Sequence, residues 1–459
     1  MKHFFRLFLA FALVGALAPA LPAMAEQTPP PVDAQNCYAL GAVDGATATY
    51  GPQGDGSVFC TLVPLNWNGD LVIFAHGYVD PTTAGPVTIP YDQLILPDKT
   101  TTLPGLITSL DYAFGITSYS KKGLAVAEGV KDVVDLVAVF KALPNPKPLG
   151  HVYLVGASEG GLVTTLAVEQ YRDVFSGGVA TCGPIGDFGN QINYCGDFRV
   201  VFDALFPTAL PPTAVTIPDG LNLQWETYTT LPIGPFTLAV STPGPLQLGI
   251  GGMVLAAEKS FPYNSLQLIN VTKAAIDLSD TTHSIMTTTL GILGYNILAT
   301  NDGKLELGGQ PFGNTTRVYR GSLNDTKLNS VVLRYSADSV NLAPYTTSGR
   351  LTRPLVTLHN TGDPIVPYWH EDLYRAKLNR ASRAMFTGIP VFRYGHCNFN
   401  ASEALFAFWL MTFKAGFVHS PVAEAAAVLP DAEQQNEFIN LAATYTGNNY
   451  QVFLPITQK

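Results

Sequence analysis

A Gly-x-Ser-x-Gly pattern between a strand-like and a helix-like segment constrains the fold of this chain more than any other feature. Residues 152–155 form a β-branched and aromatic run that is typical of a buried parallel strand. From Leu162 onward, apolar residues recur at helical spacing. Between these segments, Gly156 and Gly160 flank Ser158 two residues away on either side. This series predicts a nucleophile elbow, a tight turn that exposes the serine hydroxyl and needs glycine where a side chain would meet neighbouring backbone.

Alternating strand and helix patterns on both sides of this segment predict an α/β fold with a mostly parallel sheet. Strands are expected at 71–75 and 178–182, with an amphipathic helix at 123–143. The alternation resumes with strands at 354–358 and 390–394. Because parallel strands are joined by right-handed crossovers, we expect helices on both faces of the sheet.

The alternation stops between residues 184 and 349, where Pro, Gly, Thr and aromatic residues are abundant. The chain is longer than a single simple core usually requires. We therefore predict a core in two parts, 26–183 and 350–459, with 184–349 inserted as a lid. The end of the second part is expected to be an irregular tail.

The N-terminus carries the features of a secretory signal peptide at residues 1–25. Lys2 and Arg6 precede an apolar stretch at 7–17, and a small-x-small cleavage site follows at 23–25. That stretch is too short to span a bilayer, and no later one reaches the necessary length. We expect Sec-type export to the periplasm or medium of a bacterium. The net charge of -9, with only 13% charged residues, gives no reason to expect nucleic acid or anionic membranes as partners.

Five cysteines in an oxidising compartment are expected to form disulfides. Cys37 and Cys60 bracket a Gly-rich segment and are one expected pair. Cys182 and Cys195 are the other, which leaves Cys397 unpaired. Spacing alone does not fix the connectivity.

A serine nucleophile needs a base that takes its proton and an acid that orients the base. Asp363 follows the strand at 354–358, and His396 follows the next strand. The order Ser158, Asp363, His396 is the one used by hydrolases with this type of elbow. Two alternatives stay open: Asp363 is only a turn residue, or Asp187, after an earlier strand, is the acid.

Two backbone amides are needed to hold a developing oxyanion. Glu159, which follows the nucleophile, supplies one, and Tyr78, in the loop after the strand at 71–75, supplies the other. The Glu159 side chain itself is expected to be solvated or salt-bridged. The sequence contains no His-Glu-x-x-His, Cys-x-x-Cys, EF-hand or P-loop pattern, so no metal or cofactor is expected.

The sequence resembles the α/β-hydrolase superfamily over roughly residues 36–183 and 350–417. Four motifs fall in the order of that family: His76-Gly77, Gly156-x-Ser158-x-Gly160, Gly362-Asp363-Pro364 and Gly395-His396. The resemblance implies a serine hydrolase that acts through an acyl-enzyme on esters, less often on amides, without a cofactor.

The dipeptide His396-Cys397 also resembles the tannase and feruloyl esterase group. In that group, cysteines beside the catalytic serine and histidine are joined by a disulfide. Here Ala157 and Glu159 flank Ser158 instead. Pairing of Cys397 with Cys182 is the alternative to a buried free thiol.

These observations predict a secreted serine hydrolase that cleaves carboxylic esters of apolar or aromatic groups, on small molecules or polymer ends. Two other functions stay open. The same residues could serve a secreted aryl-acyl amidase, or the chain could be a non-catalytic binding protein on a hydrolase scaffold.

Overall fold

The computed structural model describes residues 31–54, 56–83 and 85–447. The chain divides into two compact units, Met1–Pro31 and Val32–Lys459, and only the second is described below. The predicted signal peptide, residues 1–25, lies outside the described residues, as does the end of the predicted tail, residues 448–459.

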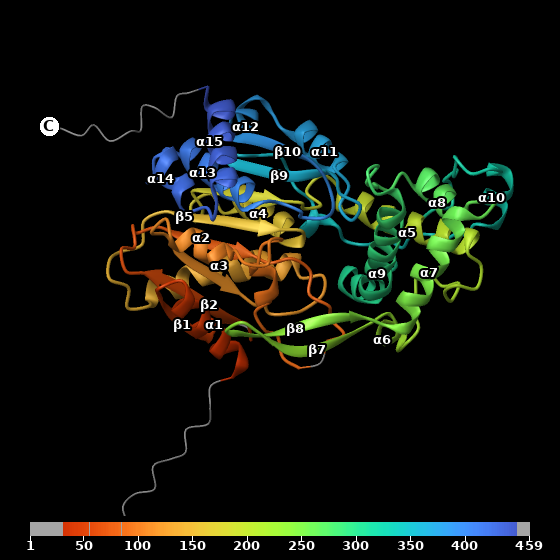
Figure 1. Ribbon diagram of the computed structural model, residues 1–459, viewed down its shortest axis with the longest axis horizontal. Helices are drawn as coiled ribbons and strands as arrows, with labels where there is room; N and C mark the ends of the chain where they lie inside the picture. The colour runs from red at the N-terminus through yellow and green to blue at the C-terminus, as the bar shows by residue number, and fades with distance from the viewer. Residues whose placement is uncertain (1–30, 55, 84, 448–459) are drawn as a thin grey trace, which may run out of the picture. The chain divides into compact units, whose positions relative to one another are not determined.

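A mixed sheet of eight strands forms the centre of the second unit (Figure 1). Its strands are β1 (Ala46–Pro52), β2 (Val58–Pro64), β3 (Leu71–Ala75), β4 (Ala113–Thr117), β5 (Val152–Ala157), β6 (Gly177–Thr181), β9 (Leu355–Gly362) and β10 (Phe386–Tyr394). They lie in the order β1-β2-β4-β3-β5-β6-β9-β10. Only β2 is antiparallel to its neighbours, and all other adjacent pairs are parallel. This order, with one reversed strand, is the α/β-hydrolase fold, which confirms the predicted fold class.

Helices cover both faces of the sheet, as parallel strands require. One face is covered by α1 (Val32–Val43), α2 (Leu103–Thr108), α13 (Ala401–Ala415), α14 (Val422–Ala427) and α15 (Ala432–Thr446). The other is covered by α3 (Val126–Ala142), α4 (Glu159–Gln170) and α11 (Trp369–Lys377). Shorter helices are η1 (Tyr91–Leu94), η2 (Ala343–Tyr345) and α12 (Arg380–Met385).

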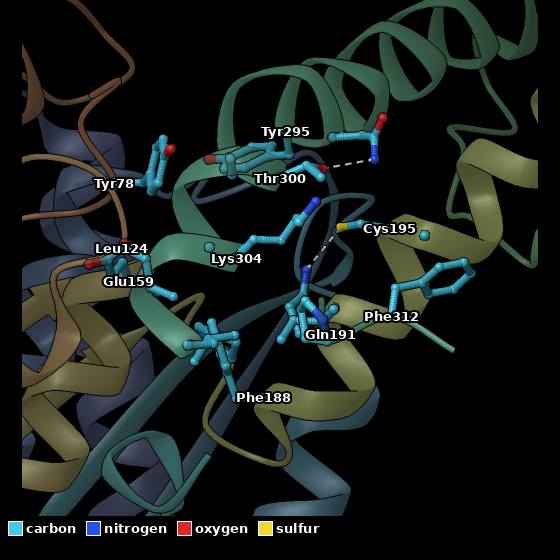
Figure 2. Close-up of a pocket in the computed structure, with 18 of the residues that line it drawn as sticks. Tyr78, Leu124, Glu159, Phe188, Gln191, Cys195, Tyr295, Thr300, Lys304 and Phe312 are labelled. Carbon is cyan, nitrogen blue, oxygen red and sulfur yellow. Dashed lines mark hydrogen bonds between the residues drawn. The ribbon is translucent and has the colours of Figure 1, made fainter. Parts of the chain in front are cut away.

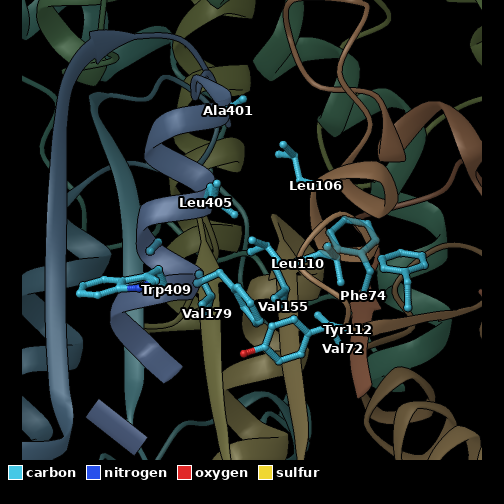
Figure 3. Packing of buried hydrophobic residues seen from close by; sticks show 14 of the residues in the cluster. Val72, Phe74, Leu106, Leu110, Tyr112, Val155, Val179, Ala401, Leu405 and Trp409 are labelled. Carbon is cyan, nitrogen blue, oxygen red and sulfur yellow. The ribbon is translucent and has the colours of Figure 1, made fainter. Parts of the chain in front are cut away.

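Side chains of each central strand alternate between these two layers. In β3, Val72 and Phe74 belong to the apolar cluster that includes α13, whereas Leu71 and Ile73 belong to the cluster that includes α3 and α4. Figure 3 shows the first cluster, where Leu405 and Trp409 of α13 lie over the strands. Burial on both faces explains why these strands appear in the sequence as continuous apolar runs.

A long segment between β6 and β9 forms its own elements and its own apolar cluster. It contains α5 (Phe188–Leu205), α6 (Leu221–Trp225), β7 (Glu226–Ile233), β8 (Phe236–Pro243), α7 (Pro245–Lys259), α8 (Asn264–Thr272), α9 (Thr281–Leu307) and α10 (Asp325–Val331). We call this segment the insertion. Figure 1 shows its helices beyond the carboxyl ends of the parallel strands, the edge at which open α/β sheets bind ligands.

The β7–β8 hairpin of the insertion extends back to the N-terminal part of the core. The Asn36 side chain in α1 makes two 2.8 Å hydrogen bonds with the backbone of Thr237 in β8. Phe236 and Leu238 are buried in the same cluster as α1 and α13. The insertion is thus attached to the core at more than its two chain connections. No helix in the described ranges is both long and apolar enough to cross a membrane.

Candidate active site

Ser158 lies in a strained turn between β5 and α4. Its backbone has φ 57° and ψ -121°, a conformation that non-glycine residues rarely adopt. A Cβ atom at Gly156 would collide with the Gly160 carbonyl oxygen, and one at Gly160 would collide with the Ala75 carbonyl oxygen. Glycine is therefore required at both positions, for the steric reason that the sequence pattern suggested.

The side chains of Ser158, His396 and Asp363 meet at the carboxyl edge of the sheet. His396 Nε2 lies 2.9 Å from Ser158 Oγ, and His396 Nδ1 lies 2.7 Å from Asp363 Oδ2. An ionised carboxylate can only accept hydrogen bonds, so Nδ1 carries the proton and Nε2 is left to accept the one from serine. The three residues predicted from the sequence, Ser158, His396 and Asp363, are thus connected by hydrogen bonds.

Asp363 is held as an anion by its surroundings. It is only 1% exposed, and its Oδ1 accepts hydrogen bonds from the amides of Ile365 and Val366, at 2.8 and 3.0 Å. Burial by itself raises the pKa of this carboxyl, but the charge of His396 and hydrogen bonds from His359 and His396 outweigh it and lower the pKa to about 2. Asp363 is therefore more than a turn residue.

Asp187, the alternative acid, has a different environment. It is the N-cap of α5, where its Oδ1 accepts a 2.9 Å hydrogen bond from the Asn190 amide. Its own amide lies 3.3 Å from His370 Nδ1. These contacts give Asp187 a role in starting a helix of the insertion, and they place His370, not His396, beside it.

A second histidine lies against Asp363 and was not singled out from the sequence. His359 Nε2 is 3.6 Å from Asp363 Oδ2, and its Nδ1 is 3.5 Å from Glu371 Oε1. Burial opposes protonation of His359, but the two carboxylates raise its pKa to about 10. The available signal was a group of polar residues in a strand expected to be buried, since Thr357, His359 and Asn360 all lie in β9 and buried polar groups usually have partners.

The loop after β3 packs directly against the turn that carries Ser158. A Cβ atom at Gly77 would lie 3.2 Å from Ser158 Cβ, so only glycine allows this approach without movement. Gln93 fixes the loop, since its Oε1 accepts a 2.7 Å hydrogen bond from the Gly77 amide and its Nε2 donates to the Tyr78 carbonyl at 3.3 Å. His76 is buried and stacked on Tyr119, with ring centroids 3.8 Å apart, and burial lowers its pKa to about 4.

The Glu159 side chain differs from the expectation that it is solvated or salt-bridged. It is 7% exposed, and its Oε1 accepts a 2.8 Å hydrogen bond from the Ala125 amide. Burial, with the nearby charge of Asp302, raises its pKa to about 8. The first residue of α4 follows the elbow directly, and its side chain is buried where the elbow meets the segment around Ala125.

Glu159 should make stability depend on pH. Between about pH 4.5 and pH 8 the unfolded chain ionises this carboxyl while the folded chain keeps the proton, so the free energy of unfolding falls as pH rises through this window. In Glu159→Gln we expect a higher melting temperature than in the wild type at pH 9, and little difference at pH 4. Thermal unfolding at both pH values measures this, with the exposed Glu424→Gln as the matched control. Equal melting temperatures of wild type and Glu159→Gln at pH 9 would contradict the assignment.

Two disulfides are formed, and one differs from the predicted pairing. Cys37 pairs with Cys60 as expected. The predicted Cys182–Cys195 pair is wrong, because Cys182 pairs with Cys397, their Cα atoms being 5.4 Å apart. Cys182 follows β6 and Cys397 follows β10, so both lie at the carboxyl edge of the sheet despite a sequence separation of 215. Cys195 is a free thiol on α5, beside Gln191.

The Cys182–Cys397 bond attaches the residue after His396 to the neighbouring part of the sheet. We expect the double variant Cys182→Ala, Cys397→Ala to lose roughly 2–5 kcal/mol of unfolding free energy. Its kcat should also fall by about 10- to 100-fold, because His396 is no longer held in place. The matched control is Cys37→Ala, Cys60→Ala, which lacks the other disulfide.

Denaturant unfolding and ester hydrolysis by both double variants measure these effects. The control should also lose unfolding free energy, but less of it, because its disulfide closes a loop with a sequence separation of 23 and not 215. Because the Cys37–Cys60 bond joins α1 to β2, away from His396, the control should keep its kcat. Equal kcat values in the two double variants would show that the Cys182–Cys397 bond does not position His396.

One group of potential metal ligands lies close together among the described residues: Cys182, His396 and Cys397. The two sulfur atoms are bonded to each other, so neither can act as a thiolate ligand. The donor set therefore does not suit a metal ion.

A largely apolar cavity of about 170 Å³ opens against Ser158. Figure 2 shows side chains from both the core and the insertion around it. Its apolar lining is Leu124, Pro184, Phe188, Ile192, Ala214, Val215, Ala299, Leu307, Pro311, Phe312, Ile365 and Val366. Its other side chains include Tyr78, Gln191, Tyr295, Asn296, Thr300, Lys304 and Gln310.

Helices of the insertion also hold the loops that carry the three residues. The Tyr194 hydroxyl in α5 donates a 2.7 Å hydrogen bond to the Pro364 carbonyl, next to Asp363. The Tyr394 hydroxyl, two residues before His396, lies 2.9 and 2.8 Å from the hydroxyls of Thr287 and Thr288 in α9. The core therefore supplies the three residues, and hydrogen bonds from the insertion hold the loops that carry Asp363 and His396.

No protein-family model matches the sequence, and a search of curated proteins gives no match. Among solved structures, feruloyl esterase B from Aspergillus oryzae matches with a TM-score of 0.42 and 16% identity, over 76% of this chain and 73% of that one. An acylaminoacyl peptidase matches with a TM-score of 0.40 and 10% identity, over 86% of this chain and 44% of that one. Est1E from Butyrivibrio proteoclasticus matches with a TM-score of 0.32 and 11% identity, over 81% of this chain and 96% of that one. Similarity at these identities and scores does not bear on the activity of this chain.

Proposed function

From this fold and this site, we propose that the chain is an exported serine hydrolase that cleaves carboxylic esters through an acyl-enzyme intermediate. One observation carries the proposal: Ser158 Oγ lies 2.9 Å from His396 Nε2, and His396 Nδ1 lies 2.7 Å from a buried, anionic Asp363. This is the geometry that activates a serine hydroxyl as a nucleophile.

In the proposed reaction, His396 takes the Ser158 proton as Oγ attacks the acyl carbonyl. His396 then gives that proton to the leaving alcohol, which leaves the acyl group on Ser158. A water molecule attacks the acyl-enzyme with His396 again acting as base, and Ser158 regains its proton as the acid departs. Asp363 keeps His396 in the required tautomer and stabilises its cationic form.

The negative charge on the carbonyl oxygen is assigned to the backbone amides of Tyr78 and Glu159. Glu159 begins α4, so its amide lies at the positive end of a helix. In the other loop, the Gly77 amide already donates to Gln93, and we therefore assign the Tyr78 amide to the oxyanion. Losing one such donor costs roughly 3 kcal/mol of transition-state stabilisation.

The size and the apolar lining of the cavity support, as substrates, esters with a compact apolar or aromatic acyl group. A cavity of about 150 Å³ with apolar walls is large enough for benzene, and this one is about 170 Å³. Residues on both α5 and α9 line it, which supports a lid role for the insertion, with the predicted boundaries 184 and 349. Two disulfides support export to an oxidising compartment.

A panel of p-nitrophenyl esters tests this substrate class. We expect kcat/KM to be highest for butyrate and benzoate and to fall for palmitate, because a long chain exceeds the cavity. The matching p-nitroanilides test whether the bond cleaved is an amide. A preference for palmitate, or faster anilide than ester hydrolysis, would contradict the proposed substrate.

A further inference from the structure

The loop that follows Asp363 is held by three side chains from different parts of the chain. Three successive carbonyls of this loop each accept a hydrogen bond: Pro364 from Tyr194, Ile365 from Gln191 and Val366 from His359, at 2.7, 2.8 and 2.8 Å. Two of the donors belong to α5 of the insertion, whereas His359 lies in β9. The Val366 amide donates to Asp363 Oδ1, so His359 and Asp363 hold the two sides of the same residue.

His359 also lies against two carboxyl groups. Its Nε2 is 3.6 Å from Asp363 Oδ2, and its Nδ1 is 3.5 Å from Glu371 Oε1. These are ion-pair distances, longer than those of most hydrogen bonds. All three side chains are at most 2% exposed, so solvent screens their charges little.

We propose that His359 is a positioning residue for the proposed reaction: it is an imidazolium that holds Asp363, and the loop after it, in place for His396. The assignment rests on the proposed function and deepens it, because it adds a buried cation and a second carboxylate, that of Glu371, behind Asp363. His359 does not line the cavity and acts only through Asp363.

The partners of His359 require a proton on each ring nitrogen. The Val366 carbonyl can only accept, so Nε2 carries a proton. Nδ1 faces a Glu371 oxygen, and two lone pairs would repel each other, so a proton lies between these atoms. Glu371 Oε2 accepts a 2.7 Å hydrogen bond from Thr357, which favours the carboxylate and leaves the proton on Nδ1. Burial opposes the charge on His359, but the two carboxylates outweigh it and raise its pKa to about 10.

His370, the other buried histidine beside Glu371, does not supply this charge. Its Nδ1 accepts a 3.1 Å hydrogen bond from the Gly186 amide, and its Nε2 donates to Gln191 Oε1 at 2.9 Å. One nitrogen is therefore an acceptor and the ring is neutral. Burial, with the charge of His359 nearby, lowers the pKa of His370 well below its usual value.

Two further titratable groups lie on the segment that packs against His359. The Tyr368 ring is edge-on to the imidazole, with ring centroids 5.7 Å apart, and burial raises the pKa of its phenol, which is therefore neutral. Arg375, further along α11, forms a 3.3 Å ion pair with exposed Asp372. Neither group competes with His359 for the charge of Asp363.

Both His359 and His396 lie against the same oxygen of Asp363. Asp363 Oδ2 is 2.7 Å from His396 Nδ1 and 3.6 Å from His359 Nε2. A positive charge on His359 therefore makes protonation of resting His396 more costly, which keeps His396 available as a base at lower pH. A neutral residue at position 359 removes this effect and leaves the charge of Glu371 uncompensated.

His359→Gln in the full chain tests the proposal, because glutamine can donate an N–H to the Val366 carbonyl but carries no charge. With p-nitrophenyl butyrate we expect kcat to fall by about 10- to 100-fold. The acid limb of the kcat/KM profile reports the free base, and it should move to higher pH by about one unit, because protonation of His396 is no longer opposed. His283→Gln, at an exposed position on α9, is the matched control and should keep the wild-type profile.

NMR of the wild-type chain with ¹⁵N-labelled histidine gives a second readout, which does not depend on the folding of a variant. The ring of His359 is identified by its contact with Tyr368. Since its pKa is about 10, both of its nitrogens should be protonated at pH 8. A neutral His359 ring at this pH would overturn the proposal.

The kinetic outcomes separate a positioning role from a packing role. A lower kcat with an unmoved acid limb means that His359 serves packing alone, and it overturns the proposal, as does an unchanged kcat or a limb that moves to lower pH. If His359→Gln does not fold, the NMR measurement decides. Ser158→Ala is assayed in parallel: activity retained there means that the proposed function fails, whereas an inactive Ser158→Ala with an unmoved limb in His359→Gln means that only the role of His359 fails.

Discussion

Ser158→Ala is expected to lower kcat for p-nitrophenyl butyrate by about 10⁴- to 10⁶-fold. The variant lacks the atom that forms the acyl-enzyme, whereas the cavity and the assigned oxyanion amides stay in place. The melting temperature should not fall, because the serine side chain is replaced by a smaller one in a turn whose conformation the glycines permit. Steady-state hydrolysis and thermal unfolding measure both.

The matched control is Ser330→Ala, at an exposed position on α10. It should have the kcat of the wild type. Activity of Ser158→Ala within about 10-fold of the wild type would contradict a mechanism that proceeds through an acyl group on this residue.

Asp363→Asn is expected to lower kcat by about 10⁴-fold. The amide is nearly the same size as the carboxylate, but it cannot stabilise the imidazolium, and its NH₂ group favours the wrong His396 tautomer. Circular dichroism shows whether the variant is folded, which matters because Asp363 is buried between two histidines.

Asp187→Asn is the matched control for the acid. An asparagine side chain can also cap α5, so this variant should keep both its stability and its kcat. A large loss of kcat in Asp187→Asn together with a small one in Asp363→Asn would identify Asp187 as the acid and contradict the assignment to Asp363.

The parts of this site that depend on local backbone geometry could be predicted from the sequence. The elbow at Ser158 needs a strand, two glycines and a helix within a few residues, and all of these are visible in order. The same holds for the ends of β9 and β10, since parallel strands bring the residues that follow them to one edge of the sheet. Asp363 and His396 meet there for that reason.

The parts that depend on contacts between distant segments could not be predicted. Proximity in the chain favours a Cys182–Cys195 pair. The actual partner of Cys182 is Cys397, which follows β10 and comes close to Cys182 only in the folded sheet. The burial of Glu159 depends on how the segment around Ala125 packs on α4. His359 gains its carboxylate neighbours from α11 and from the turn after its own strand.

The arrangement of the insertion could not be predicted either, because strand and helix patterns do not alternate regularly in its sequence. The stretch at 285–299 is apolar enough to predict a helix, but its sequence does not indicate which face of α9 meets the cavity. That face depends on Gly294 lying against Trp225 and on Asn296 bonding to Arg199, two contacts across the fold of the insertion.

The central claim is that Ser158 is a nucleophile because His396 accepts its proton. Covalent labelling with a fluorophosphonate, followed by mass spectrometry of the peptides, tests it most directly. The account predicts one label per chain, on Ser158, and labelling of His396→Ala that is slower by about 10³-fold or more. A label on another residue, no label at all, or equally fast labelling of His396→Ala would contradict it.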